Sequence, residues 1–307
     1  MSIDLQDMRC AVVVSQHKSL RQAAERLNIR QSTLSRRLRD LEYRLGVELF
    51  ERTTGGTRPT AVGEEFLKVA RHIIIETDSS FARLLAYCRG ESGGLSIGVY
   101  MAFSAGNMRA TLLEFHHRFP DVELRVADGS CLGLLSDVTT NDLDIAILTE
   151  TCPSWGGRTL PLWHERVVVA LPEEHPLCAE GAIQWSDLRK EPVVINRRDP
   201  GPEFYRLLIA KLGHRELGRT TEFDVGIDRL LSLVGAGFGF TLVLEGATGA
   251  RYPGVVFREI YHDNEPARLG FVACWREANS NPALKPFLAL LQERYPDLSV
   301  PERIIEA

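Results

Sequence analysis

The chain has 307 residues, of which 44% are hydrophobic and 25% are charged, and these averages argue against a disordered, fibrous or membrane protein. Its length exceeds what one hydrophobic core usually supports, so two or three domains are expected. The net charge of −5 is uneven, because residues 1–62 carry 11 Lys and Arg against 7 Asp and Glu. A basic head on an acidic body is typical of a DNA-binding module joined to another domain.

The location and the redox state follow from two further patterns. No apolar run approaches the roughly 20 residues needed to cross a bilayer, and the first residues lack the basic-then-apolar order of a secretory signal. We therefore expect a cytoplasmic protein with no membrane partner. The cysteines show no CxxC spacing, so reduced thiols, no metal site and no cofactor are expected. They are Cys10, Cys88, Cys131, Cys152, Cys178 and Cys274.

Two short helices are predicted first. Apolar residues recur at helical spacing from Leu5, behind Asp4 as a helix cap. Ser19 begins a capping-box pattern, which predicts a second helix through Leu27. The alanine pair at 23–24 is small enough to let a following helix approach closely, as a helix-turn-helix requires.

A third helix is predicted from about Ser32 to Leu45, with Gly46 as its stop. Free backbone N–H groups and the helix dipole at its beginning favour phosphate, while Gln and Arg side chains there can contact adenine and guanine edges. We therefore expect this end to enter a major groove. The candidate DNA-contacting residues are Gln31, Ser32, Thr33, Ser35, Arg36 and Arg37.

A small β-wing is predicted after this helix. Residues 47–52 are strand-like, residues 54–57 favour a turn, and the chain returns through residues 58–60. Arg52 and Arg58 flank the tip, where they are expected to reach the DNA backbone or the minor groove.

The segment AAERLNIRQSTLSRRLRDLEYRLGVELFERTTGGTRPTAVG resembles the N-terminal signature of the LysR-type transcriptional regulators. The likeness covers the alanine pair, the Gln-Ser at the recognition-helix start, Leu-Ser-Arg, Leu-Glu, Leu-Gly, Leu-Phe-Glu-Arg and the closing Thr-x-x-Gly. It implies DNA contacts at the residues named above. One departure concerns the wing, where family members commonly carry an arginine at the position of Gly55 and a leucine-like residue at that of Pro59. Arg58 is the candidate substitute.

A long connecting helix is predicted over residues 64–87, which contain no Gly or Pro and carry a heptad-like apolar pattern. One interpretation is a helix packed on its own chain. The family resemblance implies another, in which this helix pairs with a second subunit, so that a homodimer or homotetramer reads a two-fold operator in double-stranded DNA.

The remainder of the chain is predicted to form two α/β units. Buried strands at residues 95–99, 122–126 and 144–148 are separated by helices, which favours a βαβαβ order with a parallel sheet. A second unit begins at residues 165–171 and continues beyond residue 193. Clefts between such units, at the carboxyl ends of strands, bind small ligands.

The segments LSIGVY, EFHHRFPDVELRV, NDLDIAIL, ERVVVALPEEHPL, WSDL and SLVGAGFGFTLV resemble the effector domain of the same family, which is similar to type 2 periplasmic binding proteins. Helix starts near Ser104 and Ser130 would suit a carboxylate, with Arg197 or Arg198 as its partner. Alternatively, the serines only cap helices and the arginines are solvated. The resemblance implies effector contacts at Tyr100, Ala102, Phe103, Ser104, Gly129, Ser130, Cys131 and Asn196 to Asp199, including Arg197, with Asp224, Val225 and Glu245 as weaker candidates.

We therefore predict an α/β protein with a winged helix-turn-helix at residues 1–62, a linker helix at 63–89 and a two-subdomain effector domain at 90–300. Subdomain I is expected to cover about 90–162 and 268–300, and subdomain II about 163–267. The expected function is sequence-specific transcriptional regulation, activating or repressing, controlled by a small acidic or aromatic metabolite.

Three other functions fit the sequence less well. An enzyme is disfavoured because no G-x-S-x-G, P-loop or G-x-G-x-x-G follows a predicted strand, and His116-His117 is more typical of a surface than of a metal site. A transport binding protein would need a signal peptide and no basic helix-turn-helix. A redox-sensing regulator would use Cys131 and Cys152, but nothing basic flanks either residue and buried thiols are usually inert.

Overall fold

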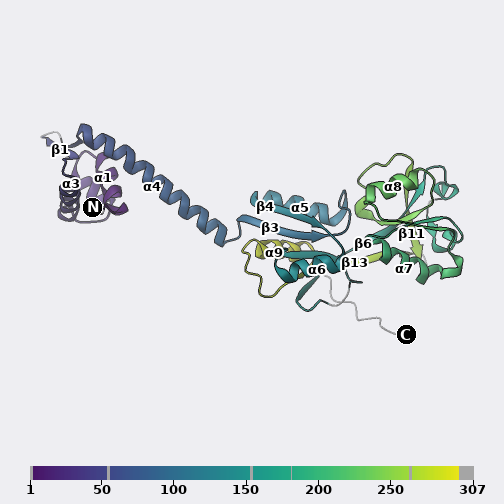
Figure 1. The fold of residues 1–307 in the computed structure, drawn as a ribbon. Coiled ribbons are helices and arrows are strands. Elements are labelled where there is room, and N and C mark those ends of the chain that lie inside the picture. The colour runs from purple at the N-terminus through teal and green to yellow at the C-terminus, as the bar shows by residue number, and fades with distance from the viewer. Residues whose placement is uncertain (1–2, 54–55, 153–154, 181, 263–264, 297–307) are drawn as a thin grey trace. The chain divides into compact units, whose positions relative to one another are not determined.

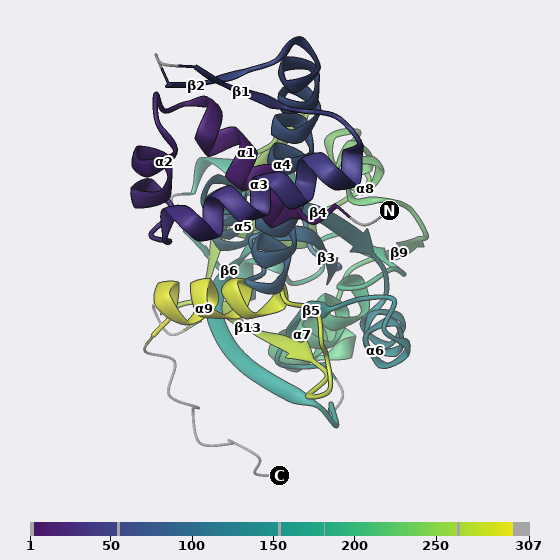
Figure 2. The same cartoon turned by 90° about the vertical axis from the view of Figure 1, so that its left-hand side faces the viewer.

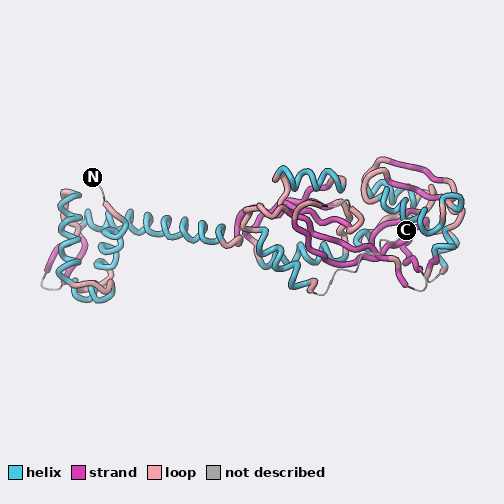
Figure 3. Tube along the Cα trace, turned by 90° about the horizontal axis from the view of Figure 1, so that it is seen from below, coloured by secondary structure: helices cyan, strands magenta, loops and turns pink. Residues whose placement is uncertain are grey.

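The protein is described here by a computed structural model of residues 1–307, in which residues 3–53, 56–152, 155–180, 182–262 and 265–296 are described (Figure 1). The chain divides into two compact units, Met1–Ala86 and Tyr87–Ala307. The first unit consists mainly of helices, whereas most of the strands lie in the second unit (Figure 3). In the described part of the chain, no helix is long and apolar enough to span a membrane.

The first unit is a three-helix cluster followed by a hairpin and the long helix (Figure 2). Its first two helices begin at the predicted capping residues. The Asp4 side chain accepts a hydrogen bond from the Asp7 N–H at 2.7 Å, and the Ser19 hydroxyl accepts one from the Gln22 N–H at 3.3 Å. The elements are α1 (Leu5–Ser15), α2 (Leu20–Arg26), α3 (Gln31–Leu45), β1 (Phe50–Thr53), β2 (Gly56–Pro59) and α4 (Ala61–Cys88).

The core of this unit holds α3 in place. Leu34, Leu38 and Leu41 on one face of α3 are buried against α1 and α2. The alanine pair at 23–24 is also buried, as close helix packing requires. Since one face of α3 is committed to the core, its opposite face is left for solvent or a ligand.

The second unit contains one continuous sheet in the order β12-β11-β6-β13-β5-β3-β4, with β10 and β7 paired beside it and a separate β8-β9 pair. The strands are β3 (Ser92–Val99), β4 (Asp121–Asp128), β5 (Ile145–Thr149), β6 (Arg158–Pro172), β7 (Ile183–Gln184), β8 (Val193–Asn196), β9 (Thr220–Phe223), β10 (Thr241–Leu244), β11 (Val255–His262), β12 (Glu265–Pro266) and β13 (Arg268–Trp275). The α-helices are α5 (Gly106–Arg118), α6 (Cys131–Thr140), α7 (Gly201–Leu212), α8 (Ile227–Gly235) and α9 (Leu284–Arg294). Four short 3-10 helices are η1 (Pro176–Ala179), η2 (Trp185–Leu188), η3 (His214–Glu216) and η4 (Glu245–Ala247).

This sheet forms two lobes joined by β6 (Figure 1). The first lobe contains β3, β4, β5 and β13, and the β3–β4 and β3–β5 pairs are parallel, as the βαβαβ pattern predicts. The first part of β6 pairs with β13 and the later part with β10 and β11, which belong to the second lobe. The strand predicted at residues 165–171 is therefore the second half of a longer strand, and the crossing between lobes falls within it.

Helices cover both faces of the first-lobe sheet. α5 and α9 lie on one face, where the Phe115 and Phe287 rings meet edge to face with centroids 5.1 Å apart. α6 lies on the other face, where Leu134 and Val138 pack on Ala146. Parallel strands covered on both faces leave their carboxyl ends and the following loops to form a binding site.

One sequence expectation is wrong. The structure joins Cys131, at the first residue of α6, to Cys152, in the loop after β5, in a disulfide with a Cα–Cα distance of 6.4 Å. Reduced thiols were expected because the two cysteines stand 21 residues apart without a recognisable motif. Their proximity comes from the fold, which places the start of α6 beside the end of β5. Cys10, Cys88, Cys178 and Cys274 are free thiols.

Candidate nucleic-acid interface and effector cavity

The beginning of α3 is an exposed polar surface with uncapped backbone. Gln31, Ser32 and Arg36 are exposed, while Thr33 and Ser35 are half-buried. The N-cap residue Arg30 makes no side-chain capping hydrogen bond. The Thr33 and Leu34 amides donate to the Arg30 carbonyl. The preceding amides of Gln31 and Ser32 are therefore the ones suited to an external acceptor, and a phosphate is the group that helix N-termini bind most readily.

Arg37 differs from its neighbours on α3. Its side chain is half-buried, its guanidinium lies beside the Cys10 thiol of α1, and its Nη1 has no hydrogen-bond partner within the described residues. Burial raises the pKa of the Cys10 thiol, although Arg37 acts in the opposite direction. This placement suits a residue that supports α3 against α1 better than one that reaches a base edge.

The predicted wing is an antiparallel hairpin in which Phe50 pairs with Pro59 and Thr53 with Gly56. Arg58 is exposed on β2. Arg52 lies on β1, but its side chain, like the tip residues Thr54 and Gly55, lies outside the described residues. The hairpin is held close to the end of α1, because the Thr57 N–H donates to the Lys18 carbonyl at 3.2 Å.

Gly56 is required at this contact. Its φ is +117°, and a Cβ there would meet the Lys18 carbonyl oxygen at 2.1 Å. A side chain at residue 56 would therefore push the hairpin away from α1. The β1–β2 hairpin thus has a fixed position within the first unit.

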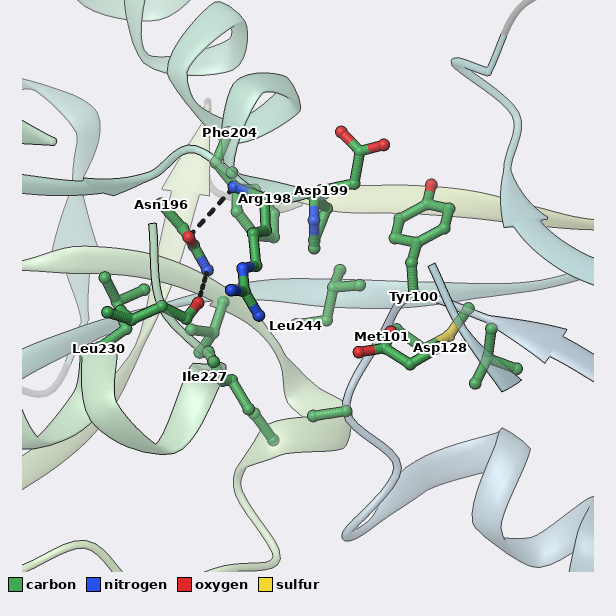
Figure 4. A pocket seen from close by; sticks show the side chains of 18 of the residues that line it. Tyr100, Met101, Asp128, Asn196, Arg198, Asp199, Phe204, Ile227, Leu230 and Leu244 are labelled. Atoms are coloured by element: carbon green, nitrogen blue, oxygen red, sulfur yellow. Dashed lines mark hydrogen bonds between the residues drawn. The ribbon is translucent and has the colours of Figure 1, made fainter. Parts of the chain in front are cut away.

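The second unit contains a cavity of about 800 Å³ between the two lobes. Figure 4 shows Tyr100, Met101 and Asp128 on its first-lobe side and Asn196, Arg198 and Leu230 on the other. The lining is mainly apolar, with a few polar groups at the loops. It consists of Val99, Tyr100, Met101, Ala102, Phe103, Val126, Asp128, Gly129, Ser130, Ile195, Asn196, Arg197, Arg198, Asp199, Pro200, Gly201, Phe204, Val225, Gly226, Ile227, Leu230, Thr241, Leu242, Val243, Leu244 and Ala247.

Most of the predicted effector residues lie together in this cavity. Those that line it are Tyr100, Ala102, Phe103, Gly129, Ser130, Asn196, Arg197, Arg198, Asp199 and Val225. Ser104, Cys131, Asp224 and Glu245 do not line it. The Ser104 hydroxyl donates to the Gly246 carbonyl at 2.8 Å, and the Glu245 carboxylate accepts from Arg166 Nε at 2.6 Å.

Asp224 and Ser130 have structural partners. The exposed Asp224 carboxylate accepts from Arg198 Nε at 2.6 Å, and this hydrogen bond lowers the pKa of Asp224. The Ser130 hydroxyl accepts from the Gly133 N–H at 3.1 Å and caps α6. Ser130 therefore combines a capping role with a place on the cavity wall.

Several lining residues had no signal in the sequence. Ile227 and Leu230 of α8 face the cavity, whereas Leu231 and Val234 of the same helix face the core. Phe204 and Met101 similarly belong to both the core and the lining. Such residues have the spacing of ordinary core positions, so only the tertiary fold distinguishes them.

The loop after β8 is shaped by its own hydrogen bonds. Asn196 Nδ2 donates to the Val225 carbonyl at 3.0 Å, and Asn196 Oδ1 accepts from the Arg198 N–H at 3.1 Å (Figure 4). These bonds join the ends of β8 and β9 and present Arg197 to Asp199 along one side of the cavity.

Two polar links connect the lobes beside the cavity. The Thr149 hydroxyl at the end of β5 donates to Glu203 Oε1 on α7 at 2.9 Å, and the Tyr100 hydroxyl lies 2.5 Å from Thr149 Oγ1. The Cys131 N–H at the start of α6 donates to Asp199 Oδ2 at 2.8 Å. Burial raises the pKa of both Glu203 and Tyr100.

Glu165 occupies the point where β6 passes between the lobes. It is 1% exposed, and its Oε1 accepts from Trp163 Nε1 at 3.0 Å. Its Oε2 is buried with no hydrogen-bond partner in the part of the chain that the structure describes. Burial raises the pKa of Glu165 to about 7.

Both units match known families. A model described as bacterial regulatory helix-turn-helix protein, lysR family, matches residues 5–64, and one described as LysR substrate binding domain matches residues 89–296. The HTH-type transcriptional regulator AlsR of Bacillus subtilis (strain 168) is 27% identical over 291 residues, which cover 93% of this chain and 94% of AlsR. The uncharacterized HTH-type transcriptional regulator YnfL of Escherichia coli (strain K12) is 30% identical over 247 residues, covering 79% of this chain and 82% of YnfL.

The solved structure of CbnR, a LysR family transcriptional regulator, has the same fold. It superposes with a TM-score of 0.84 at 21% identity and covers 94% of this chain and 100% of CbnR. Full-length CbnR has also been solved in complex with its target DNA. These matches confirm the fold class and the resemblance on which the sequence interpretation rests.

Proposed function

Because the chain belongs to the LysR family of DNA-binding transcriptional regulators, we propose that the exposed beginning of α3 reads operator DNA under the control of a metabolite bound between the lobes. The proteins it matches are regulators and not enzymes. The observation that carries the proposal is an uncapped, exposed polar helix start in the same chain as a mainly apolar cavity of about 800 Å³.

The proposed DNA contacts divide by chemistry. Gln31 and Arg36 are exposed and can make bidentate contacts to base edges, which supply sequence choice. Ser32, Thr33 and Ser35 and the first amides of α3 suit phosphate oxygens, which position the helix without selecting a sequence. Arg58 of the hairpin, together with Arg52, is proposed to contact the adjacent DNA backbone or minor groove. Arg37 is proposed to support α3 by packing toward α1.

The DNA assignment is tested by incubating the full-length protein with fragments of its own genome at moderate salt and sequencing what it retains. We expect a few enriched sites with two-fold symmetry, and affinity that falls steeply with salt because phosphate contacts release counterions. Uniform retention of all fragments would contradict sequence-specific reading.

For the effector, the lining favours a small monocarboxylate with an aromatic or branched apolar body. Arg198 is hydrogen-bonded to Asp224, whereas the exposed Arg197 side chain has no hydrogen bond or salt bridge to any described residue and only a smaller electrostatic interaction with Asp224. Arg197 is therefore the cation that remains for a ligand carboxylate. Apolar side chains such as Ile227, Leu230 and Phe204 would then cover the body of the ligand.

The effector class is tested by thermal unfolding with benzoate, phenylacetate and isovalerate and with the neutral amide of each. At least one acid is expected to raise the melting temperature more than its amide does, and Arg197→Ala should remove that difference. Arg251→Ala, which removes an exposed charge outside the cavity lining, is the matched control. Equal responses to acid and amide, or no response to any acid, would overturn the assignment.

A second copy of the chain is the proposed partner of α4. Phe81, Leu84 and Leu85 in its later turns are exposed, although the earlier Leu67 and Ala70 are buried in the core of the first unit. Pairing of two such helices gives a homodimer, or a homotetramer by further contacts, that presents two copies of α3 to a two-fold operator. Because such a homodimer would act on DNA, we propose a cytoplasmic location. Light scattering of wild type against Leu84→Asp tests this, and an unchanged mass would contradict it.

A further inference from the structure

The Cys131–Cys152 disulfide lies where the two lobes of the effector unit are linked. Cys131 is the first residue of α6, directly after Ser130 of the cavity wall, and its N–H is the donor to Asp199 of the opposite lobe. Cys152 follows Thr149, the donor to Glu203 of α7, and its N–H bonds to the Thr149 carbonyl at 3.1 Å. Each cysteine therefore adjoins one of the two interlobe links.

Tyr100 contacts the Thr149–Glu203 link and also lies beside the disulfide. Its hydroxyl accepts from the Thr149 N–H at 2.9 Å, lies 3.5 Å from Glu203 Oε2 and is 3.8 Å from the Cys152 sulfur. Tyr100 lines the cavity. A change in the position of Cys152 would therefore alter both the cavity wall at Tyr100 and the contact between the lobes.

We propose that the Cys131–Cys152 pair is a reversible thiol–disulfide switch that sets the strength of the interlobe links and, through them, the DNA affinity of this regulator. The part of the proposal that concerns regulation rests on the proposed function. The disulfide tethers the start of α6 to the loop after β5, so the Cys131 and Thr149 donors keep their positions. Opening the bond frees both segments.

The switch is a two-electron exchange with a cellular dithiol or with glutathione. A thiolate of the reductant attacks the sulfur of half-buried Cys152, because Cys131 is the more buried of the two. The S–S bond breaks, Cys131 leaves as a thiolate and takes a proton, and a mixed disulfide forms on Cys152. A second thiol of the reductant then attacks this mixed disulfide, releases the Cys152 thiol and leaves the reductant as a disulfide. A low-molecular-weight disulfide reverses the reaction.

The first test needs neither DNA nor effector. Full-length protein is equilibrated without oxygen in mixtures of reduced and oxidised glutathione, quenched with acid, alkylated and weighed intact. We expect two thiols, assigned by peptide mapping to Cys131 and Cys152, to pair and open reversibly across the range of these mixtures. Cys88→Ser should behave as wild type, and the double variant Cys131→Ser/Cys152→Ser should show no paired form.

The second test asks whether the bond acts on the interlobe links. Hydrogen exchange at residues 131–134, 149–152 and 199–203 is expected to be about fivefold faster or more in the reduced protein, because both donor segments are released. Exchange in α1, α2 and α3 should not change. The double serine variant should show the fast exchange at any glutathione ratio.

The third measurement connects the switch to regulation. The dissociation constant for a DNA fragment retained by the protein is expected to differ about fivefold or more between the two redox forms, and to be the same at all glutathione ratios in the double serine variant. The proposal is overturned if the cysteines never pair, if they stay paired in fully reduced glutathione, or if they cycle without changing hydrogen exchange across the lobes or DNA affinity. Absence of any retained DNA would refute the proposed function, while the first two tests would still decide whether the switch exists.

Discussion

The two units of this regulator place their functional residues in different ways. In the first unit the proposed recognition residues occupy positions 31–37 of one helix, and the core that holds them comes from the same unit. In the second unit the cavity draws residues from Val99 to Ala247 and from both lobes. The proposed DNA-reading helix can thus be specified by a short local pattern, whereas the cavity proposed for the effector depends on the tertiary fold.

The largest effect is expected from breaking the core beneath α3. Leu34→Ala removes a fully buried side chain and should destabilise the first unit by about 2–5 kcal/mol, since the site loses apolar contacts and retains a cavity. Urea unfolding followed by hydrogen exchange of α1 to α3 measures this. Tyr43→Ala, on the exposed side of the same helix, is the control and should change stability by less than about 0.5 kcal/mol.

A pH effect of intermediate size is expected at Glu165, where the lobes join. Burial raises its pKa from 4.5 to about 7, so the folded protein holds this proton more tightly than the unfolded chain does. The stability that this proton contributes is fully present below pH 4.5 and is lost as the pH rises to about 7. The loss is about 3 kcal/mol by the relation between a pKa shift and free energy.

The variant Glu165→Gln should remove that part of the pH dependence. Its melting temperature is expected to fall less than that of wild type between about pH 5 and about pH 8. Glu174→Gln, at an exposed position, should keep the wild-type dependence. If wild type and Glu165→Gln showed parallel curves, the carboxyl would be ionised in the folded protein throughout this range.

The smallest effect is expected at Ser130. Substitutions there can distinguish a helix-capping role from a contact with the ligand. Ser130→Ala should cost about 1 kcal/mol, because the Gly133 N–H loses its acceptor at the start of α6. Ser130→Asn should restore most of this stability, and Ser136→Ala within α6 should have little effect. Urea denaturation reports the cost. A large loss of carboxylate binding with unchanged stability would instead identify Ser130 as a ligand contact.

The sequence was sufficient for the features that depend on near neighbours. The face formed by Leu34, Leu38 and Leu41, the glycine stop at Gly46 and the parallel βαβαβ order all follow from local periodicity and turn chemistry. The family resemblance, and not periodicity, pointed to Tyr100 in the loop after β3, which lines the cavity at the carboxyl ends of the parallel strands.

Features that depend on long-range contacts could not be predicted. Cys131 meets Cys152, and Asp199 reaches the start of α6, only because β5, β8 and α6 are brought together by the fold. Arg36 and Arg37 are neighbouring arginines on α3, but Arg37 lies beside Cys10 because its position on the helix faces α1. None of these contacts leaves a periodic pattern in the sequence.

The beginning of α3 is proposed to select the DNA sequence. Fluorescence anisotropy with a retained operator fragment and a scrambled duplex tests this most directly. Gln31→Ala/Arg36→Ala should weaken operator binding about 100-fold, from about 1–3 kcal/mol for each bidentate contact, and should reduce the preference over the scrambled duplex. Arg251→Ala should leave both affinities unchanged. If the double variant bound the operator as tightly and as selectively as wild type, α3 would not be the element that reads the sequence.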